Sequence, residues 1–400
     1  MQEIVVVMCL LFRADFGYWL SVGCVEDHIN GNLKVGSLQT KQKILIVANS
    51  ARMLAQLANK SGYQPIVIDC FADKDTQTAA IDFCKIPSLA LTNIQKAVLS
   101  LQDRHSFGHV IYGSGFEYHN DSLAFLHQNY IVLGNSYDCF IDIQNKPYFF
   151  SQLDRLHIPY PETLFSPPLK GSNWLLKPLR GEGGLGIKKY QPESNHSDAN
   201  YYWQKKVVGE AISVLFIANS LNFEVIGFHQ QQVLGLEGCE FIFSSIVNKL
   251  NVDKAIELTI VSWLGKLVTQ FKLQGLNSLD FIVSGTDCYV LEINARPSAS
   301  MQLYSNDLIS AHINSIVSGE LTKQVAGNSY HGYQIIYAET GLTLNKNICW
   351  PEWVVDIPDL DGLIHTSMPI CSIIATDKSQ QQVLDLLLLR RQQLNKLLYR

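Results

Sequence analysis

Two stretches of the chain contain residues whose types and spacing could act on a phosphorylated ligand. The first is KPLRGEGGLGIKKY, from Lys177 to Tyr190, which has four glycines in six positions and basic residues on both sides. Its glycines at 181, 183 and 186 match the pattern G-x-G-x-x-G, which occurs in dinucleotide-binding folds and in the loop that covers ATP in kinases. Glycine tolerates positive φ, so consecutive backbone N–H groups in such a loop can converge on a phosphate.

The sequence around this loop argues against several interpretations. A dinucleotide-binding fingerprint needs a helix directly after the third glycine, whereas IKKYQP, which follows here, is β-like and ends in proline. A Walker A loop needs Gly-Lys-Ser/Thr, and a protein kinase needs H-R-D and D-F-G; neither set follows. We interpret the loop, with Glu182, Gly183 and Gly184, as a hairpin tip that closes over phosphates, while Lys177 supplies positive charge. A plain glycine-rich surface hairpin is the alternative.

The second stretch is LDFIVSGTDCYVLEINARP, which predicts a β-hairpin. If residues 285–287 form a three-residue turn, Asp280 faces Glu292 and Asn294 lies two residues on, on the same strand face. Facing carboxylates destabilise a sheet unless a cation separates them, and two carboxylates with an amide oxygen are ligands of the Mg²⁺ type. Arg296, on the same alternation, places a guanidinium beside the metal, where it suits phosphate oxygens. The alternative is a solvent-facing strand with an ordinary scatter of charges.

The segment before these stretches has the pattern of a parallel α/β domain. KILIVANS at 43–50 and the later QPIVIDC are short buried-strand patterns, and ARMLAQLANKSGY between them has helical spacing, which makes a β-α-β unit. Residues 109–117 and 129–136 continue the sheet, and strands here end in Gly, Ser or Asn, at the edge where open α/β sheets bind ligands. We expect one α/β domain over approximately 43–140.

The rest of the chain alternates strand-like and helical segments. A short helix and a proline-rich connector are expected over 145–168, a long helix over about 253–273, and a second helix after Ser305. Strands are expected from Tyr330 on, followed by a terminal helix over 378–400. The other expected strands are 173–178, 186–191, 201–208, 213–217 and 221–228, with the hairpin at 278–294.

The composition limits the classes of function. Four hundred residues predict two or three folding units rather than one core. With 47% hydrophobic residues and a net charge of −5, the chain lacks the basic excess of a dedicated nucleic-acid-binding protein. Its nine cysteines are odd in number and form no C-x-x-C, which favours reduced thiols over disulfides or zinc.

The N-terminus contains an apolar run at 4–12 that is too short to span a bilayer. No basic residues precede it as they would in a signal peptide, although LSVGC, ending at Cys24, is similar to a lipoprotein cleavage box. We therefore expect an extension outside the main fold and a cytoplasmic protein that does not associate with a membrane.

Together these motifs resemble those of the ATP-grasp enzymes, a superfamily of carboxylate–amine and related ligases. The resemblance covers roughly 43–328 and includes, in order, an α/β pre-domain, a lysine before the connector, the K-P…G-G-x-G hairpin, a hinge, and paired acidic strands ending in E-I-N-x-R. It implies an α/β fold with α+β elements. The implied parts are an N-terminal extension at 1–40, a pre-ATP-grasp α/β domain at 41–142, an ATP-grasp domain at 143–328, with a glycine-loop subdomain at about 146–208 and a metal-site subdomain at about 209–328, and a small β-rich C-terminal module with a terminal helix at 329–400.

The resemblance also implies roles for individual residues. Lys146 and Lys177 match two lysines that contact the phosphates, and Arg296 matches an arginine near the γ-phosphate and the bound carboxylate; Lys177 and Arg296 are the catalytic candidates. Glu182, Gly183 and Gly184 match the mobile loop, and Gln204, Lys206 and Val208 match the hinge that holds adenine. Glu210 matches the acid that binds the ribose hydroxyls. Asp280, Glu292 and Asn294 match the magnesium ligands. Each has an alternative: Lys146 could be a solvated helix start and Glu210 a turn residue. The family usually has an acid at or near Gln204, so the hinge assignment could slip by one or two positions.

Four more residues are candidates for the substrate side of the site. Ser298 and Ser300 follow the arginine in ARPSASMQLY and should line the acceptor side. Glu117 and Tyr118, beyond the strand pattern that starts at 109, could reach the same cleft from the pre-domain. Ordinary loop polarity is the alternative explanation for all four.

The resemblance implies ATP and Mg²⁺ (or Mn²⁺) as cofactors and a small-molecule carboxylate and amine as substrates. In the implied reaction the carboxylate attacks the γ-phosphate, and an amine then displaces phosphate from the acyl phosphate to form an amide. A biotin-carboxylase-like enzyme, a non-catalytic nucleotide-binding protein and an NAD-binding dehydrogenase are the alternatives. The C-terminal segment resembles a module of an ATP-grasp subgroup associated with methanopterin- and methanofuran-type one-carbon cofactor metabolism. Many members of the family are homodimers, so a homodimer is an expectation for this chain.

Overall fold

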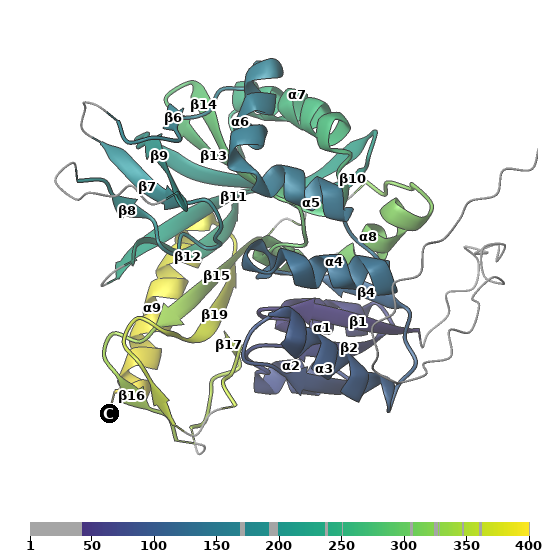
Figure 1. Cartoon of the computed structure of the whole chain (residues 1–400). Coiled ribbons are helices and arrows are strands. Elements are labelled where there is room, and N and C mark those ends of the chain that lie inside the picture. The colour runs from purple at the N-terminus through teal and green to yellow at the C-terminus, as the bar shows by residue number, and fades with distance from the viewer. Residues whose placement is uncertain are drawn as a thin grey trace, which may run out of the picture. The chain divides into compact units, whose positions relative to one another are not determined.

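The computed structural model describes residues 42–168, 173–191, 199–236, 239–249, 251–304, 307–323, 327, 329–345, 348–359 and 362–399. The extension expected at 1–40 lies outside the described residues. Figure 1 shows a mixed α/β architecture, in which a helix-flanked parallel sheet precedes a small and a large antiparallel sheet.

The first sheet is parallel and has the strand order β3-β2-β1-β4-β5. Its strands are β1 (Lys43–Ala48), β2 (Gln64–Asp69), β3 (Asp82–Lys85), β4 (His109–Tyr112) and β5 (Ile131–Val132). The helices that join them are α1 (Arg52–Lys60), α2 (Lys74–Ala79), α3 (Leu91–Gln102), η1 (Phe116–Tyr118) and α4 (Asn120–Asn129). Strands β1 and β2 are buried apolar runs, as expected for a sheet that helices cover on both faces. The strand order reverses between β1 and β4, where open α/β sheets bind ligands.

Two helices connect this sheet to the small antiparallel sheet. Helix α5 (Tyr137–Gln144) starts at Ser136, whose side chain accepts a bond from the backbone of Cys139. Helix α6 (Lys146–Arg155) starts at Asn145, which caps the backbone N–H of Tyr148. The small sheet has the order β6-β9-β7-β8. Its strands are β6 (Thr163–Leu164), β7 (Trp174–Pro178), β8 (Lys188–Lys189) and β9 (Tyr201–Lys205). The glycine loop joins β7 to β8.

The large sheet is antiparallel and has the order β14-β13-β10-β11-β12-β15-β19-β17. Its strands are β10 (Glu210–Asn219), β11 (Phe223–Leu236), β12 (Cys239–Lys249), β13 (Gln274–Ser284), β14 (Asp287–Asn294), β15 (Tyr330–Tyr337), β17 (Val354–Val355) and β19 (Pro369–Asp377). Further elements are α7 (Lys254–Phe271), η2 (Ala299–Leu303), α8 (Leu308–Val317), the paired β16 (Leu342–Thr343) and β18 (Leu363–Ile364), and α9 (Gln380–Leu398). Strands β15, β19 and β17 extend this sheet through the β12–β15 pairing, and α9 contacts β15 and β19.

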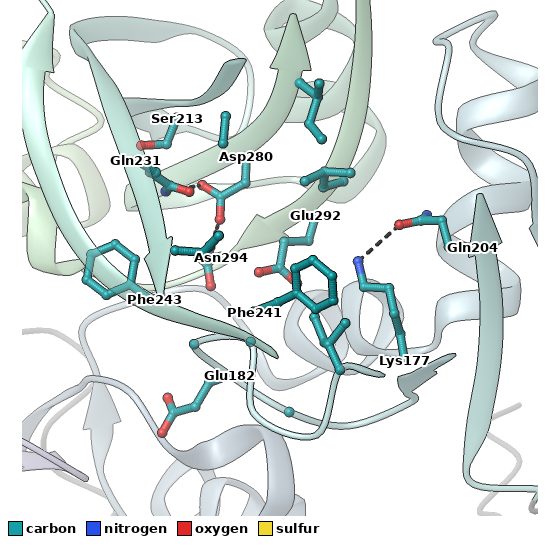
Figure 2. A pocket seen from close by; sticks show the side chains of 18 of the residues that line it. Lys177, Glu182, Gln204, Ser213, Gln231, Phe241, Phe243, Asp280, Glu292 and Asn294 are labelled. Atoms are coloured by element: carbon teal, nitrogen blue, oxygen red, sulfur yellow. Dashed lines mark hydrogen bonds between the residues drawn. The ribbon is translucent and has the colours of Figure 1, made fainter. Parts of the chain in front are cut away.

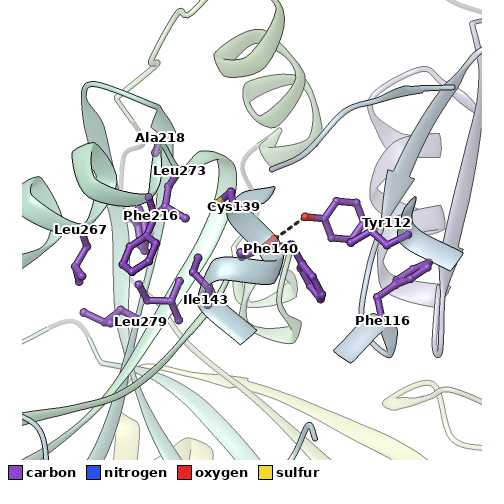
Figure 3. Close-up of a cluster of buried hydrophobic side chains, with 14 of the residues drawn as sticks. Tyr112, Phe116, Cys139, Phe140, Ile143, Phe216, Ala218, Leu267, Leu273 and Leu279 are labelled. Carbon is purple, nitrogen blue, oxygen red and sulfur yellow. Dashed lines mark hydrogen bonds between the residues drawn. The ribbon is translucent and has the colours of Figure 1, made fainter. Parts of the chain in front are cut away.

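The core runs from the parallel sheet to the large sheet through α5. Figure 3 shows Tyr112 of β4 and Phe116 of η1 near Phe140 of α5, and Phe216 of β10 beyond it. The Tyr112 hydroxyl donates to the backbone carbonyl of Ala295 at 2.9 Å. Because Ala295 follows β14 directly, this buried bond ties the parallel sheet to the strand that contains the predicted acid pair.

Three expectations about the elements need correction. Strand β8 contains only Lys188–Lys189, whereas a strand was expected over 186–191. Strand β9 ends at Lys205 rather than at 208. No strand was expected over 239–249, yet β12 pairs with β11 there, and β11 itself extends to Leu236. These strands are long because they lie inside the sheet, where neighbours on both sides supply hydrogen bonds.

Candidate active site

The β13–β14 hairpin brings the two predicted metal carboxylates together. Asp280 and Glu292 are direct cross-strand partners, as the sequence predicted. The predicted three-residue turn is wrong: Ser284 pairs with Asp287, which leaves a two-residue turn that begins at Gly285, with a φ of 63°. A bulge between Asp280 and Phe281 then shifts the register by one residue and restores the facing pair.

Two amides hold the Asp280 carboxylate. Asn294 Nδ2 donates to Asp280 Oδ2 at 3.2 Å, and Gln231 Nε2 donates to Asp280 Oδ1 at 3.2 Å. Figure 2 shows these side chains pointing into one pocket with Glu292. Burial and, second, the neighbouring Glu292 carboxylate raise the pKa of Asp280 to about 7. The pair therefore carries an electrostatic cost that a bound cation would relieve.

Two lysines lie on the other side of the acid pair. Lys146, the first residue of α6, places Nζ 4.0 Å from Glu292 Oε2. Lys177 Nζ donates to Gln204 Oε1 at 3.0 Å. Burial lowers the pKa of Lys177 to about 8; the negative charge of Glu292 opposes this effect and the positive charge of Lys146 adds to it. Two ammonium groups near one cavity suit a polyphosphate ligand.

The glycine loop lies against strand β12. The backbone N–H of Phe243 donates to the carbonyl oxygen of Gly183 at 2.8 Å. A Cβ atom at Gly184 would lie 1.9 Å from the carbonyl oxygen of Phe241, and its φ of 79° also disfavours other residues. Glycine is therefore needed at 184 for the loop to approach β12 this closely.

Arg296 joins the loop to the parallel-sheet domain. Its Nε donates to Glu117 Oε1 at 2.9 Å, and its Nη2 lies 3.6 Å from Glu182 Oε2. Asn49, at the carboxyl end of β1, donates from Nδ2 to Glu182 Oε1 at 3.2 Å. Burial raises the pKa of Glu182 to about 7, and Glu117 adds to the effect by repulsion, which Arg296 only partly offsets. Arg296 thus contacts two carboxylates, and its guanidinium is a group that binds anionic oxygen atoms.

A cavity of about 420 Å³ lies between the two antiparallel sheets and the glycine loop. Most of the predicted site residues line it: Lys146, Lys177, Glu182, Gly183, Gly184, Gln204, Lys206, Asp280, Glu292, Asn294, Arg296, Ser298 and Ser300. Four do not: Val208, Glu210, Glu117 and Tyr118. Val208 is 80% exposed and Tyr118 47%, Glu210 begins β10 outside the lining, and Glu117 is buried behind Arg296.

The sequence analysis missed several residues that line the cavity. Gln231 bonds to Asp280 from β11, and Ser213 lies on β10 opposite the same residue. Phe241 and Phe243 supply an apolar wall from β12. The polar run HQQQ inside an otherwise apolar strand was a signal for Gln231, because polar side chains in a buried strand need partners.

The donor set fits a hard divalent cation only with help from a ligand. Among the described residues there is no group of three or more histidine, cysteine and acidic side chains that could hold a metal. Asp280, Glu292 and Asn294 supply two carboxylates and an amide, all oxygen donors of the type that Mg²⁺ prefers. Mg²⁺ commonly completes its shell with substrate phosphates and water, so the residues fit a metal that arrives with a nucleotide.

A family model described as an ATP-grasp domain matches residues 143–300. These residues are an ATP-grasp domain. They contain both predicted lysines, the glycine loop and the acid pair, so the resemblance inferred from the motifs is confirmed.

Curated relatives cover parts of the chain. An uncharacterized protein of Methanocaldococcus jannaschii is 22% identical over 261 residues, which are 62% of this chain and 64% of that protein. The large chain of carbamoyl phosphate synthase from Thermoplasma volcanium is 30% identical over 119 residues, 28% of this chain and 11% of that one. The chain therefore spans less than two thirds of the length of either relative.

Solved ATP-grasp structures share the fold over most of the chain. An ATP-analogue complex of biotin carboxylase from Campylobacter jejuni has a TM-score of 0.66 at 15% identity and covers 86% of this chain and 89% of its own. An ADP complex of N5-carboxyaminoimidazole synthetase from Staphylococcus aureus has a TM-score of 0.67 at 15% identity, with 88% and 97% covered. An L-amino acid ligase from Bacillus licheniformis has a TM-score of 0.67 at 14% identity, with 89% and 98% covered.

Two further expectations concern the environment of the chain. No helix among the described residues is both long and apolar enough to cross a membrane. None of the cysteines whose side chains the structure describes forms a disulfide; these are Cys70, Cys84, Cys139, Cys288, Cys349 and Cys371.

Proposed function

We propose that this chain is an ATP- and Mg²⁺-dependent ligase that activates a carboxylate as an acyl phosphate and joins it to an amine. One observation carries the proposal: the acid pair Asp280–Glu292, with Asn294, faces Lys146 and Lys177 across a single cavity. This set of charges matches a metal-bound triphosphate. The solved structures similar to this chain include a biotin carboxylase with an ATP analogue, an N5-carboxyaminoimidazole synthetase with ADP, and an L-amino acid ligase.

The chain's residues would act mainly by positioning and electrostatics. Asp280, Glu292 and Asn294 would hold Mg²⁺, which supplies charge neutralisation for phosphoryl transfer. Lys146 and Lys177 would bind the phosphates from the opposite side. The backbone N–H groups of the glycine loop would cover the same phosphates and exclude water.

Arg296 would orient the attacking carboxylate. Its guanidinium lies at the end of β14, two residues beyond Asn294, and it is 8% exposed. Glu117 accepts a bond from Nε, and Glu182, which lines the cavity, lies 3.6 Å from Nη2. A substrate carboxylate that replaced Glu182 would pair with Arg296 near the γ-phosphate. Ser298 and Ser300, which share a hydrogen bond of 2.8 Å, would line the side from which the amine attacks.

A screen for ADP release with paired carboxylates and amines tests the proposal. The panel includes amino acids, polyacids, polyamines, and methanopterin- and methanofuran-type cofactor acids, because the C-terminal segment resembles a module linked to them. We expect ADP release only when a carboxylate and an amine are both present. Release with bicarbonate and biotin would indicate a carboxylase instead, and Mg·ATP binding without turnover on any pair would indicate a nucleotide-binding protein.

The Glu292→Ala variant connects this activity to the acid pair. We expect it to lose at least about a hundredfold in kcat, because a metal ligand stabilises charge in the transition state. Its melting temperature should not fall, since the change removes a carboxylate that repels Asp280. Glu257→Ala is the matched control, because Glu257 is a surface residue paired with Lys254 and should leave turnover unchanged. Full turnover in Glu292→Ala would refute the assignment.

A further inference from the structure

A row of polar side chains crosses the large sheet and starts at the acid pair. The registers of five adjacent strands place these residues opposite one another in sequence: Glu292 on β14, Asp280 on β13, Ser213 on β10, His229 on β11 and Asn248 on β12. Ser213 is 1% exposed, His229 0% and Asn248 3%. Polar groups this deep in a sheet need hydrogen-bond partners, so the partners of each side chain in the row indicate its role.

The inner end of the row is fully bonded. Asn248 accepts a bond from the backbone N–H of His331 at 2.7 Å and donates to the carbonyl of Ser329 at 3.3 Å. His229 Nε2 lies 2.8 Å from the hydroxyl of Tyr304, and His229 Nδ1 lies 3.3 Å from Ser213 Oγ. His229 therefore connects Tyr304, which lies in an apolar cluster, to Ser213, which lines the cavity.

The Tyr304 hydroxyl packs closely against β11. A Cβ atom at Gly227 would lie 2.0 Å from the Tyr304 hydroxyl oxygen, so only glycine leaves room for the phenol against β11. In the part of the chain that the structure describes, His229 is the hydrogen-bond partner found for this hydroxyl. If Tyr304 accepted a bond from His229, its own proton would be buried without an acceptor, which is costly.

These contacts fix the direction of the hydrogen bonds. Burial lowers the pKa of His229 to about 3, so the ring is neutral and has one donor and one acceptor nitrogen. Tyr304 donates to Nε2, and Nδ1–H therefore points to Ser213, whose backbone bonds to His229 and whose Oγ lies 3.3 Å from Nδ1. The Ser213 hydroxyl proton is then left to point elsewhere, and Ser213 lines the cavity beside Asp280. Figure 2 shows Ser213, Gln231 and Asp280 on the same side of the pocket.

We propose that the Ser213 hydroxyl donates a hydrogen bond to an oxygen atom of bound Mg·ATP, and that His229 and Tyr304 are positioning residues that fix this donor. The inference rests on the proposed function, because it assumes that the cavity binds a nucleotide. The chemical class of the ligand atom follows from the bond direction: Nδ1 of His229 carries a proton and cannot accept that of Ser213, so the Ser213 hydroxyl can donate to an oxygen atom of the ligand.

His312 is an internal control for the direction of these bonds. It is as deeply buried as His229, but both of its nitrogens contact backbone groups. The N–H of Leu276 donates to His312 Nδ1 at 2.8 Å, and Nε2 lies 3.0 Å from the carbonyl oxygen of Leu133. His312 must therefore be protonated on Nε2, the opposite of the tautomer assigned to His229.

Nitrogen-15 NMR of the full chain with labelled histidine tests the bond direction without nucleotide or turnover. We expect His229 to be protonated on Nδ1 and His312 on Nε2, with assignments from His229→Gln and His312→Gln spectra. In Tyr304→Phe, His229 should change to the Nε2-protonated form, because Ser213 becomes its remaining side-chain partner. Protonation of His229 on Nε2 in the unmodified protein would overturn the proposal.

Calorimetric titration with a non-hydrolysable ATP analogue and Mg²⁺ tests the ligand contact. We expect Ser213→Ala to weaken binding about tenfold or more, since the lost bond is to a charged acceptor, and Ser213→Thr to restore most of the affinity. Ser315→Ala is the matched control, because Ser315 is equally buried and donates to the carbonyl of His312. Tyr304→Phe should weaken binding less than Ser213→Ala.

The outcomes separate this inference from the proposed function. If the unmodified protein binds the nucleotide and Ser213→Ala binds equally well, the inference fails and the function stands. If the unmodified protein does not bind the nucleotide, both fail. If Ser213→Ala does not fold, the binding and NMR results of Tyr304→Phe decide the question.

Discussion

Lys177 is the cavity lysine whose charge changes with pH just above neutrality. It lies opposite the acid pair, and burial lowers its pKa to about 8. Below that pH it is an ammonium group that attracts phosphates; above it the group is neutral. Bound phosphates would raise its pKa again, so proton uptake accompanies binding at high pH.

We therefore expect the affinity for Mg·ATP to fall above pH 8, by up to tenfold per pH unit. Calorimetric titrations between pH 7.5 and 9.5 measure this dependence above the pKa of about 7 that Asp280 and Glu182 have. In Lys177→Arg the charge persists over this range, so the affinity should be weaker but independent of pH there. A fall that persists in Lys177→Arg would belong to another group.

The Glu182 carboxylate lies beside Arg296, where we propose that a substrate carboxylate binds. Its carboxylate lies 3.6 Å from Arg296 Nη2, whereas Glu117 accepts a bond from Nε. The same carboxylate accepts a bond from Asn49 of the parallel-sheet domain. A loop residue thus links the two sides of the site, and a bound carboxylate would compete with it for Arg296.

At the scale of elements, two glycines of the glycine loop share an unusual backbone conformation but differ in the space around them. Gly183 and Gly184 both have positive φ, 61° and 79°. A Cβ at Gly184 would collide with the backbone of β12, whereas a Cβ at Gly183 meets nothing within 4 Å. Alanine at either position costs about 1–2 kcal/mol of backbone strain in this conformation, but only alanine at 184 blocks docking.

We expect Gly184→Ala to keep its fold and to lose the docked loop, with Mg·ATP binding weakened at least tenfold. Gly183→Ala is the matched control and should remain close to the unmodified protein. Limited trypsinolysis measures docking directly, because the exposed Arg180 lies next to the loop: cleavage after it should accelerate in Gly184→Ala. Equal cleavage rates in the two variants would show that contact with β12 does not hold the loop.

The acid pair shows how much of the site could be predicted from the sequence. The two-residue period of a strand, combined with an assumed turn, placed Asp280 opposite Glu292, and the structure has this pair. The turn that produced this register was predicted wrongly, and the bulge compensated for the error. Shortening the turn by one residue and inserting a bulge each shift the register by one residue. The two shifts cancel here, so the facing pair was predicted correctly although neither the turn nor the bulge was.

Residues contributed by distant strands could not be predicted in the same way. Gln231 reaches Asp280 only because β10 lies between β11 and β13, a pairing order that no short motif encodes. The aromatic wall on β12 was missed for the same reason. The motifs predicted the residues that carry charge, whereas the neighbours that orient those charges depend on the strand order of the whole sheet.

At the scale of the molecule, a buried ion pair connects the parallel-sheet domain to the C-terminal segment. Arg52, at the start of α1, donates from Nε to Asp356 Oδ1 at 2.6 Å, and the side chains are 5% and 15% exposed. Asp75 of α2 accepts bonds from the backbone N–H groups of Asp356 and Ile357. Burial alone would raise the pKa of Asp356, but Arg52 outweighs this and holds the pKa below its ordinary value.

We expect Asp356→Asn to lower the free energy of unfolding by about 3 kcal/mol, because it leaves a buried guanidinium without its nearest partner. Asparagine tolerates the positive φ of this position, 54°, so the change isolates the charge. Arg104→Ala, which breaks the exposed pair with Asp82, should cost less than about 1 kcal/mol. Since a lowered pKa stabilises the fold only while the carboxylate is ionised, the effect of Asp356→Asn in urea titrations should shrink below about pH 4. A constant difference from pH 7 to pH 3 would mean that the ion pair contributes nothing through its charge.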